Sequence, residues 1–274
     1  MELTYSKNSM IINFKLPDNN CETVYLSKVV EHLKEKDLSD DFNLVVTEFV
    51  DSNIIFPENK RTILILTGDE RYQIPNCLDQ AFLVFKNYVK EEYKNLIPLP
   101  LGYNKSLLEI PFISIQDRTI DVFFSGQVNI PNRFSLFNFL NENFHDLNKH
   151  VNRTPAFRKG YDATTYSNYL MNTKIAFVPD GCICSESFRF FEASKYGCVL
   201  ITMPKPSNWV YNGFCGFIVN SWEESLEIVY SLMLDEDLLK SCSKNSLEYW
   251  KKYCSEESVA NFIIERIQNE TNIR

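Results

Sequence analysis

The sequence predicts an α/β protein with two Rossmann-like halves, each built around a parallel sheet. Short apolar, β-branched runs alternate with helical patterns along the 274 residues, which is typical of βαβ units. A stretch of mixed composition, residues 106–118, separates two such series and suits a linker. The length also suits two compact domains rather than one minimal core. We therefore expect domains at 1–110 and 111–274, with the final helix packing back on the first domain.

The first half begins with strands and ends with a proline-limited segment. The expected strands are 10–16, 44–50 and 62–66, with a helix over 25–36; residues 82–93 have helical or mixed character, and 95–104 are extended.

A second series of alternating strands and helices follows. The expected strands are 120–127, 150–153, 174–181, 198–203 and 216–219, and the expected helices are 132–144, 164–171, 185–197, 221–234 (with Ser221 at its N-cap) and 236–267.

Composition narrows the class of protein. Hydrophobic residues make up 45% and aromatic residues 14%, which is enough for a sizeable core and excludes a disordered chain. The net charge is −8, from 28 Lys plus Arg against 36 Asp plus Glu. An acidic surface disfavours nonspecific nucleic-acid binding, so no nucleic-acid partner is expected. A local basic pocket for a small phosphorylated ligand remains compatible with this balance.

Cysteines and hydropathy indicate the cellular setting. The eight cysteines form no CxxC pair, and none of the three histidines lies at ligand spacing from a cysteine. We therefore expect reduced thiols acting as small core residues, with no bound metal. The N-terminus has no leader pattern, and no run approaches the roughly 20 apolar residues of a membrane span. The expectation is a soluble cytoplasmic protein.

Polar residues follow three of the expected strands. Open parallel sheets place ligands at the carboxyl ends of their strands, which points to "TGDE" (67–70), "SGQVN" (125–129) and the loop 179–187. Neither GxGxxG nor GxxxxGK[ST] occurs. A nucleotide site would therefore depend on helix N-termini and side chains.

The stretch "SESFRFFEASKYG" (185–197) carries an unusual charged pair at a helix start. Ser185 or Ser187 can cap the helix and Gly197 can end it. The first turn has free N–H groups and a partial positive charge, which suit an anion. Arg189 is mildly unfavourable there unless an anionic ligand compensates for it, and Glu192 falls on the same face.

The alternative for these charges is structural. Arg189 and Glu192 would then form an exposed ion pair that contributes only a few tenths of a kcal/mol. The aromatic residues beside them, Phe188, Phe190 and Phe191, fit core packing better than a stacking platform.

This helix and its surroundings resemble exostosin-like (GT47-type) glycosyltransferases. "SESFRFFEASKYGCVLI" is similar to the family's donor-site helix, and "YSNYLMNTKIAFVPDG" (166–181) to the segment before it. "DVFFSGQVNIPNR", "LILTGDE" and "IPLPLGY" are supporting matches. The resemblance covers most of residues 62–202.

The resemblance implies a GT-B fold, in which two Rossmann-like domains face each other across a cleft. The second domain would bind a nucleotide-diphosphate sugar, by family habit a UDP-sugar, and the first domain the acceptor. Arg189 would contact the diphosphate and Glu192 the ribose. The donor-binding residues expected are Ser125, Gly126, Arg133, Ser187, Phe188, Arg189 and Glu192.

The resemblance also implies an inverting, metal-independent reaction. Retaining GT-B enzymes have two Glu eight residues apart, whereas Glu186 and Glu192 are six apart. Inversion needs one general base, and Asp69 and Glu70 are the candidates; the alternative is that both simply end a strand at a turn. Tyr103 is the acceptor-side candidate, with ordinary packing as its alternative.

Three functions fit the sequence. The leading one is an inverting glycosyltransferase for polysaccharide assembly, with a glycan or glycolipid acceptor and peripheral membrane contact left open. A second is a non-catalytic nucleotide- or glycan-binding partner subunit of a glycan-assembly complex. A third is another nucleotide-sugar enzyme, such as an epimerase.

Overall fold

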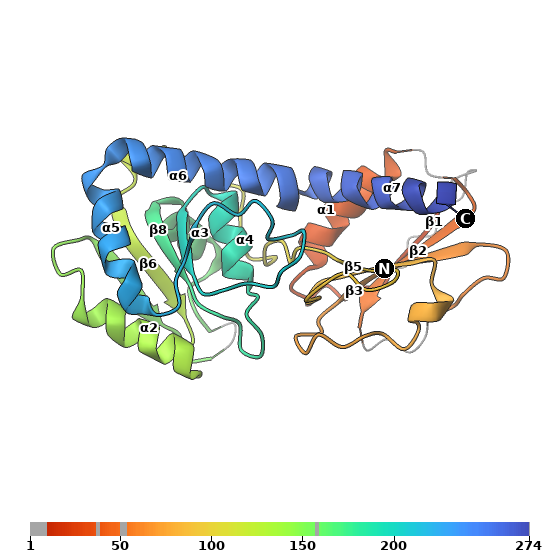
Figure 1. Cartoon of the computed structure of the whole chain (residues 1–274), viewed down its shortest axis with the longest axis horizontal. Helices are drawn as coiled ribbons and strands as arrows, with labels where there is room; N and C mark the ends of the chain where they lie inside the picture. Colours follow the sequence, from red (N-terminus) through yellow and green to blue (C-terminus); the bar gives the residue numbers. More distant parts are fainter. Residues whose placement is uncertain (1–9, 37–38, 50–53, 157–158, 274) are drawn as a thin grey trace. The chain divides into compact units, whose positions relative to one another are not determined.

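The protein contains two compact α/β units. Figure 1 shows the computed structural model, which describes residues 10–36, 39–49, 54–156 and 159–273. Unit 1 comprises the chain up to Lys105, Pro206–Asn212 and the segment from Tyr253 onward; unit 2 comprises Ser106–Lys205 and Gly213–Lys252. The change of unit after Lys105 falls at the start of the stretch expected to be a linker.

Unit 1 is built on a five-stranded parallel sheet in sequential order. The strands are β1 (Ile11–Phe14), β2 (Phe42–Glu48), β3 (Arg61–Thr67), β4 (Leu83–Lys86) and β5 (Leu96–Pro98), in the order β1-β2-β3-β4-β5. Helix α1 (Thr23–Lys34) follows β1. Within the described residues, the later strands are joined by loops and the short 3-10 helix η1 (Leu78–Gln80) rather than by α-helices. The regular strand–helix alternation expected here is therefore wrong for most of this unit.

Residues 82–93 depart most clearly from expectation. Their first part is strand β4, not a helix, and Leu83, Val84 and Phe85 are all fully buried. A short apolar run buried on both faces is typical of a central parallel strand. Periodicity alone cannot distinguish such a run from a buried helix.

A distant part of the chain completes the core of unit 1. Helix α7 (Glu256–Ile273) packs against α1, and Figure 1 shows the two side by side. The Tyr25 hydroxyl donates to the Cys254 carbonyl at 2.6 Å, and the Phe85 and Phe262 rings lie 6.4 Å apart. On the other face of the sheet, Leu64 and Leu66 pack in a second apolar cluster beneath η1.

Unit 2 has a doubly wound sheet. Its parallel strands are β6 (Ile120–Gly126), β7 (Lys149–Arg153), β8 (Thr173–Val178), β9 (Val199–Thr202) and β10 (Phe217–Ile218), in the order β10-β9-β8-β6-β7. Its α-helices are α2 (Pro131–Glu142), α3 (Ala163–Met171), α4 (Phe188–Lys195), α5 (Ser225–Leu234) and α6 (Glu236–Tyr249). Strand order reverses between β6 and β8, and ligands of such sheets bind at this switch point.

The last helical stretch is interrupted. A π-helical segment, Trp250–Cys254, follows α6 and precedes α7, so residues 236–267 are helical as expected and are divided by this segment. None of the helices in the described ranges is long and apolar enough to cross a membrane.

The eight cysteines are all free thiols. Cys21, Cys184, Cys198 and Cys254 are buried, as expected of small core residues, whereas Cys182 and Cys215 are exposed. The core expectation is therefore wrong for those two.

Candidate functional site

Two loops meet at the switch point of unit 2. Strand β6 ends at Ser125 and Gly126, and β8 leads into the loop 179–187. The first loop opens helix α2 and the second opens helix α4, so two helix N-termini and their basic side chains are directed to the same edge of the sheet. The sequence singled out both loops, and the fold brings them together.

Arg189 links the two loops. Its Nε donates to the carbonyl of Ser125 at 2.7 Å. A Cβ placed on Gly126 would lie 2.6 Å from Arg189 Nη2, so glycine leaves the space that the guanidinium occupies. The terminal nitrogens of Arg189 have no hydrogen-bond partner among the described residues, and they are the groups that bind phosphate oxygens in pairs.

No side chain caps the start of α4, and among its first-turn N–H groups that of Phe190 donates to the Ser187 carbonyl at 3.2 Å. Ser187 is the N-cap residue, but its hydroxyl makes no cap hydrogen bond and donates to the Pro179 carbonyl at 3.5 Å instead. The first N–H groups of a helix have no partner within the helix. An anion at this end would therefore meet backbone donors as well as Arg189.

The end of α4 confirms the expected stop signal. Gly197 has φ of +68°, and the N–H groups of Gly197 and Cys198 donate to Ser194 and Ala193 at 3.0 Å each. This is a Schellman motif. Phe190 and Phe191 are fully buried, which confirms their packing role, whereas Phe188 is only partly buried.

Glu192 is a buried acceptor. Only 4% of its surface is exposed, and its Oε2 accepts the Tyr166 hydroxyl at 2.7 Å. Burial, followed by the neighbouring Glu192 charge, raises the pKa of Tyr166 well above its usual value, so the phenol keeps its proton and donates. The exposed Arg189–Glu192 pair considered above is therefore not the arrangement present.

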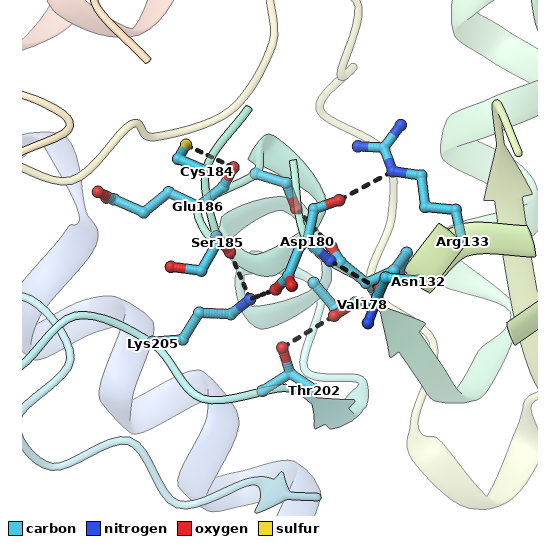
Figure 2. A network of polar contacts seen from close by, with 11 residues as sticks. Asn132, Arg133, Val178, Asp180, Cys184, Ser185, Glu186, Thr202 and Lys205 are labelled. Atoms are coloured by element: carbon cyan, nitrogen blue, oxygen red, sulfur yellow. Dashed lines mark hydrogen bonds and ion pairs between the residues drawn. The ribbon is translucent and has the colours of Figure 1, made fainter. Parts of the chain in front are cut away.

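Arg133 is buried and contacts the loop after β8. It is 5% exposed, and its Nε donates to the Asp180 carbonyl at 2.8 Å. Figure 2 shows Arg133 and Asn132 reaching this loop from α2. Arg133 therefore positions the loop that carries α4.

Lys205 holds the same loop from the other side. Its Nζ lies 3.3 Å from Asp180 Oδ1 and donates to the Ser185 carbonyl at 2.5 Å (Figure 2). Burial lowers the pKa of Lys205, although the charges of Asp180 and Glu186 oppose this effect. Sequence analysis missed this lysine, because nothing in "MPKPSN" distinguishes it from a surface residue.

In unit 1, Asp69 is engaged in a buried ion pair. Its Oδ2 lies 2.9 Å from Lys86 Nζ, with side-chain exposures of 5% and 0%. The same carboxylate accepts the backbone N–H groups of Arg71 and Gln73 at 3.1 and 2.6 Å. These contacts match the strand-end alternative for Asp69.

Glu70 differs from its neighbour. It is partly buried, and its Oε2 is buried without a hydrogen-bond partner among the described residues. An uncompensated buried carboxylate oxygen is costly unless a ligand or water satisfies it. Of the two base candidates, Glu70 is therefore the one with a carboxylate oxygen available to a ligand.

A third carboxyl group, Glu22, lies close to Glu70 and was missed. It precedes α1, is 5% exposed, and its Oε1 accepts from Asn87 Nδ2 at 3.4 Å. Burial, with smaller contributions from the charges of Glu48 and Glu70, raises the pKa of Glu22 to about 7. A carboxyl group that titrates near neutrality is suited to proton transfer. In sequence, an acidic residue at a helix start predicts only a favourable dipole interaction.

Tyr103 is a packing residue in this structure. It is 1% exposed, its hydroxyl donates to Glu256 Oε1 at 2.6 Å, and its ring meets Tyr25 edge-on at 5.4 Å. These contacts match the packing alternative. No cluster of three or more His, Cys, Asp or Glu side chains that could hold a metal ion occurs in the part of the chain described.

No protein-family profile and no curated protein matches the sequence. Solved structures do match. TarM matches with a TM-score of 0.51 and 12% identity over 89% of this chain and 57% of its own. An alpha-glucosyltransferase bound to UDP-glucose and abasic-site DNA matches with a TM-score of 0.52 and 9% identity over 90% of this chain and 84% of its own. Accessory secretory protein 1, 2 and 3 of Streptococcus pneumoniae matches with a TM-score of 0.52 and 10% identity, over 85% of this chain and 54% of its own.

These matches concern the fold. The chain has the two-unit α/β fold of GT-B glycosyltransferases, as the resemblance predicted. It spans little more than half the length of TarM and of the accessory secretory protein.

Proposed function

We propose that the chain is a glycosyltransferase that binds the diphosphate of a nucleotide sugar at the switch point of unit 2. The observation that carries the proposal is the junction of Arg189 with the Ser125 carbonyl over Gly126. It directs a guanidinium fork and the N-terminus of α4 to one place. Both groups stabilise the charge that develops on a departing diphosphate.

The finer features of the proposal come from the sequence motif. "SESFRFFEASKYG" supports an exostosin-like enzyme, with Glu192 accepting hydrogen bonds from the ribose. The Glu186–Glu192 spacing supports inversion, and Arg189 with the helix N–H groups could stabilise the leaving group without a metal. UDP is the proposed nucleotide, which agrees with the UDP-glucose bound to one structural neighbour.

We place the general base on unit 1. Glu70 has the unpartnered oxygen, and Glu22 is the neighbouring carboxyl group with a pKa of about 7. Glu70 would take the acceptor proton as its hydroxyl oxygen attacks the anomeric carbon and the diphosphate departs from the opposite face. Asp69 would hold Lys86 and the following turn in place.

Calorimetry with UDP and UDP-glucose in EDTA tests the donor site. We expect wild-type protein to bind, and Arg189→Ala to bind about 10- to 100-fold more weakly, because a charge-assisted hydrogen bond contributes about 1.5–3 kcal/mol. Lys244→Ala removes an exposed positive charge from α6 and should bind normally. Equal binding by Arg189→Ala, or no nucleotide binding by folded wild-type protein, would refute the proposal.

A partner-subunit role is the second candidate. One structural neighbour is a complex named for accessory secretory proteins and another is a glycosylation-associated protein complex. Acceptor-free hydrolysis of bound UDP-sugar, followed by NMR, separates the two roles. Release of free sugar that stops in Glu70→Gln supports an enzyme, and its first-formed anomer reports inversion or retention. Binding without turnover under any condition supports the partner subunit.

A further inference from the structure

Unit 1 contains a cavity that the donor site does not use. It has a volume of about 580 Å³ and opens between the end of β2 and the segment 73–80. Its apolar lining includes Phe49, Ile54, Phe56, Leu66 and Ile74. Small-molecule sites in proteins are concave and predominantly apolar, in this range of volume.

The cavity adjoins the carboxylate groups of unit 1. The Phe49 ring lies 5.1 Å from Lys86 Nζ, and Lys86 pairs with Asp69. Asp69 in turn accepts the backbone N–H of Gln73, another lining residue. Two lining residues, Phe49 and Gln73, therefore contact the polar groups at the carboxyl ends of β3 and β4.

Those polar groups are suited to a hydroxylated ligand. Glu48, directly before Phe49, accepts from Asn20 Nδ2 at 2.9 Å. The unpartnered Glu70 Oε2 follows Asp69 in the chain, and Asn87 Oδ1 is also buried without a partner among the described residues. Unpartnered buried acceptors call for O–H or N–H donors.

We infer that this cavity binds an alkyl chain on the acceptor, so that the acceptor is an amphiphile with a sugar or other hydroxylated head at the carboxylates. This inference rests on the proposed transferase function and names its acceptor class. A free oligosaccharide would leave its hydroxyl groups facing Phe49, Phe56 and Leu66 without partners, at a cost in free energy. An alkyl chain instead gains from the burial of each methylene group.

The chain-length dependence of binding tests the inference directly. We would titrate the protein with methyl, butyl, hexyl and octyl β-D-glucopyranoside by calorimetry, each below its micelle concentration. Each added methylene buried in a pocket should tighten binding about threefold to fourfold. A dissociation constant that does not change from methyl to octyl would overturn the inference.

Cys77 provides a reporter that needs no substitution. It lines the cavity and is partly buried, whereas Cys182 and Cys215 are exposed elsewhere. Octyl glucoside should slow alkylation of Cys77, measured by peptide mass spectrometry, and leave the two exposed thiols unaffected. Equal protection by methyl glucoside, or no protection, would contradict an alkyl-binding cavity.

A matched pair of variants locates the site. Gln80 is an exposed lining residue, and Gln268 is an exposed residue of α7 that does not line the cavity. Gln80→Trp should reduce octyl glucoside affinity at least tenfold, whereas Gln268→Trp should leave it unchanged. If both variants bind octyl glucoside as wild type does, the chain lies elsewhere and the inference is wrong.

The same samples distinguish this inference from the proposed function. Arg189→Ala should retain the chain-length dependence while binding UDP more weakly. UDP binding without chain-length dependence would refute the alkyl site alone. Chain-length dependence without UDP binding would refute the transferase and leave only a lipid-binding cavity.

Discussion

At the residue scale, burial separates carboxyl groups that look alike in sequence. Asp69 and Glu70 are adjacent, but only Asp69 is held by Lys86 and two backbone N–H groups. Sequence analysis left both as candidates and could not choose between them, because the partner of Asp69, Lys86, comes from the next strand. Glu22 escaped notice for the same reason: its neighbours Glu48 and Asn87 are brought to it only by the fold.

Glu22 should make stability depend on pH. Its pKa rises from 4.5 to about 7 in the folded protein, so the folded state holds the proton more tightly. The protonated Glu22 therefore stabilises the folded state fully below pH 4.5. This stabilisation, roughly 3 kcal/mol, is lost as the pH rises from 4.5 through 7. Glu22→Gln has no such proton to lose. The difference in free energy of unfolding, Glu22→Gln minus wild type, should therefore increase by that amount from pH 4.5 to pH 8.

Urea denaturation at a series of pH values measures this difference. Glu58→Gln, which changes an exposed carboxylate of the same unit, is the matched control and should track wild type across the range. A Glu22→Gln curve parallel to wild type would mean that Glu22 titrates normally in the folded protein.

At the element scale, the strand–loop–helix junction of unit 2 is the part that sequence predicted best. The expected helix 185–197 and strand 198–203 are present as α4 (Phe188–Lys195) and β9 (Val199–Thr202), with the glycine stop between them. The two loops of this unit that were expected to bind a ligand come together there, because doubly wound sheets gather their loops at the switch point. The same reasoning could not foresee that Ser187 turns its hydroxyl to Pro179, since that depends on the path of the preceding loop.

Gly126→Ala tests the junction between β6 and α4. The added methyl group would clash with Arg189 Nη2 and push the guanidinium from the Ser125 carbonyl. UDP affinity should fall about tenfold or more, since about 1.4 kcal/mol corresponds to a factor of ten. Thermal stability should change little, because Gly126 does not require a positive φ.

Ser231→Ala, a small exposed change on α5, controls for general effects on unit 2 and should bind UDP as wild type does. Undiminished UDP affinity in Gly126→Ala would show that Arg189 does not need its present position to bind the diphosphate.

At the scale of the whole molecule, the sequence does not predict which distant segments of the chain join the same unit. Unit 1 draws on three separate segments, and Trp209 from the second stacks on Phe262 from the third, with ring centroids 3.9 Å apart. Packing of a final helix on the first domain was expected; the contribution of residues 206–212 was not. When a segment packs on a distant part of the chain in this way, no local pattern in the sequence indicates it.

Ile263→Ala tests the contribution of α7 to unit 1. Ile263 is fully buried, and truncation of a buried isoleucine costs about 2–5 kcal/mol. Hydrogen exchange should quicken in peptides from β3 and β4 but not in those from β6 and β8. The exposed Gln268→Ala on the same helix should exchange like wild type, and uniform quickening in both units would contradict an effect confined to unit 1.

Because α7 lies near the C-terminal end of the sequence, it is synthesised long after the strands that it covers. The strands of unit 1 emerge first, yet the helix that covers one face of their sheet is encoded after residue 253. All of unit 2 is translated in the interval, so it can finish folding first. Until then the nascent first unit presents apolar strand surface, a form that chaperones bind and that aggregates readily.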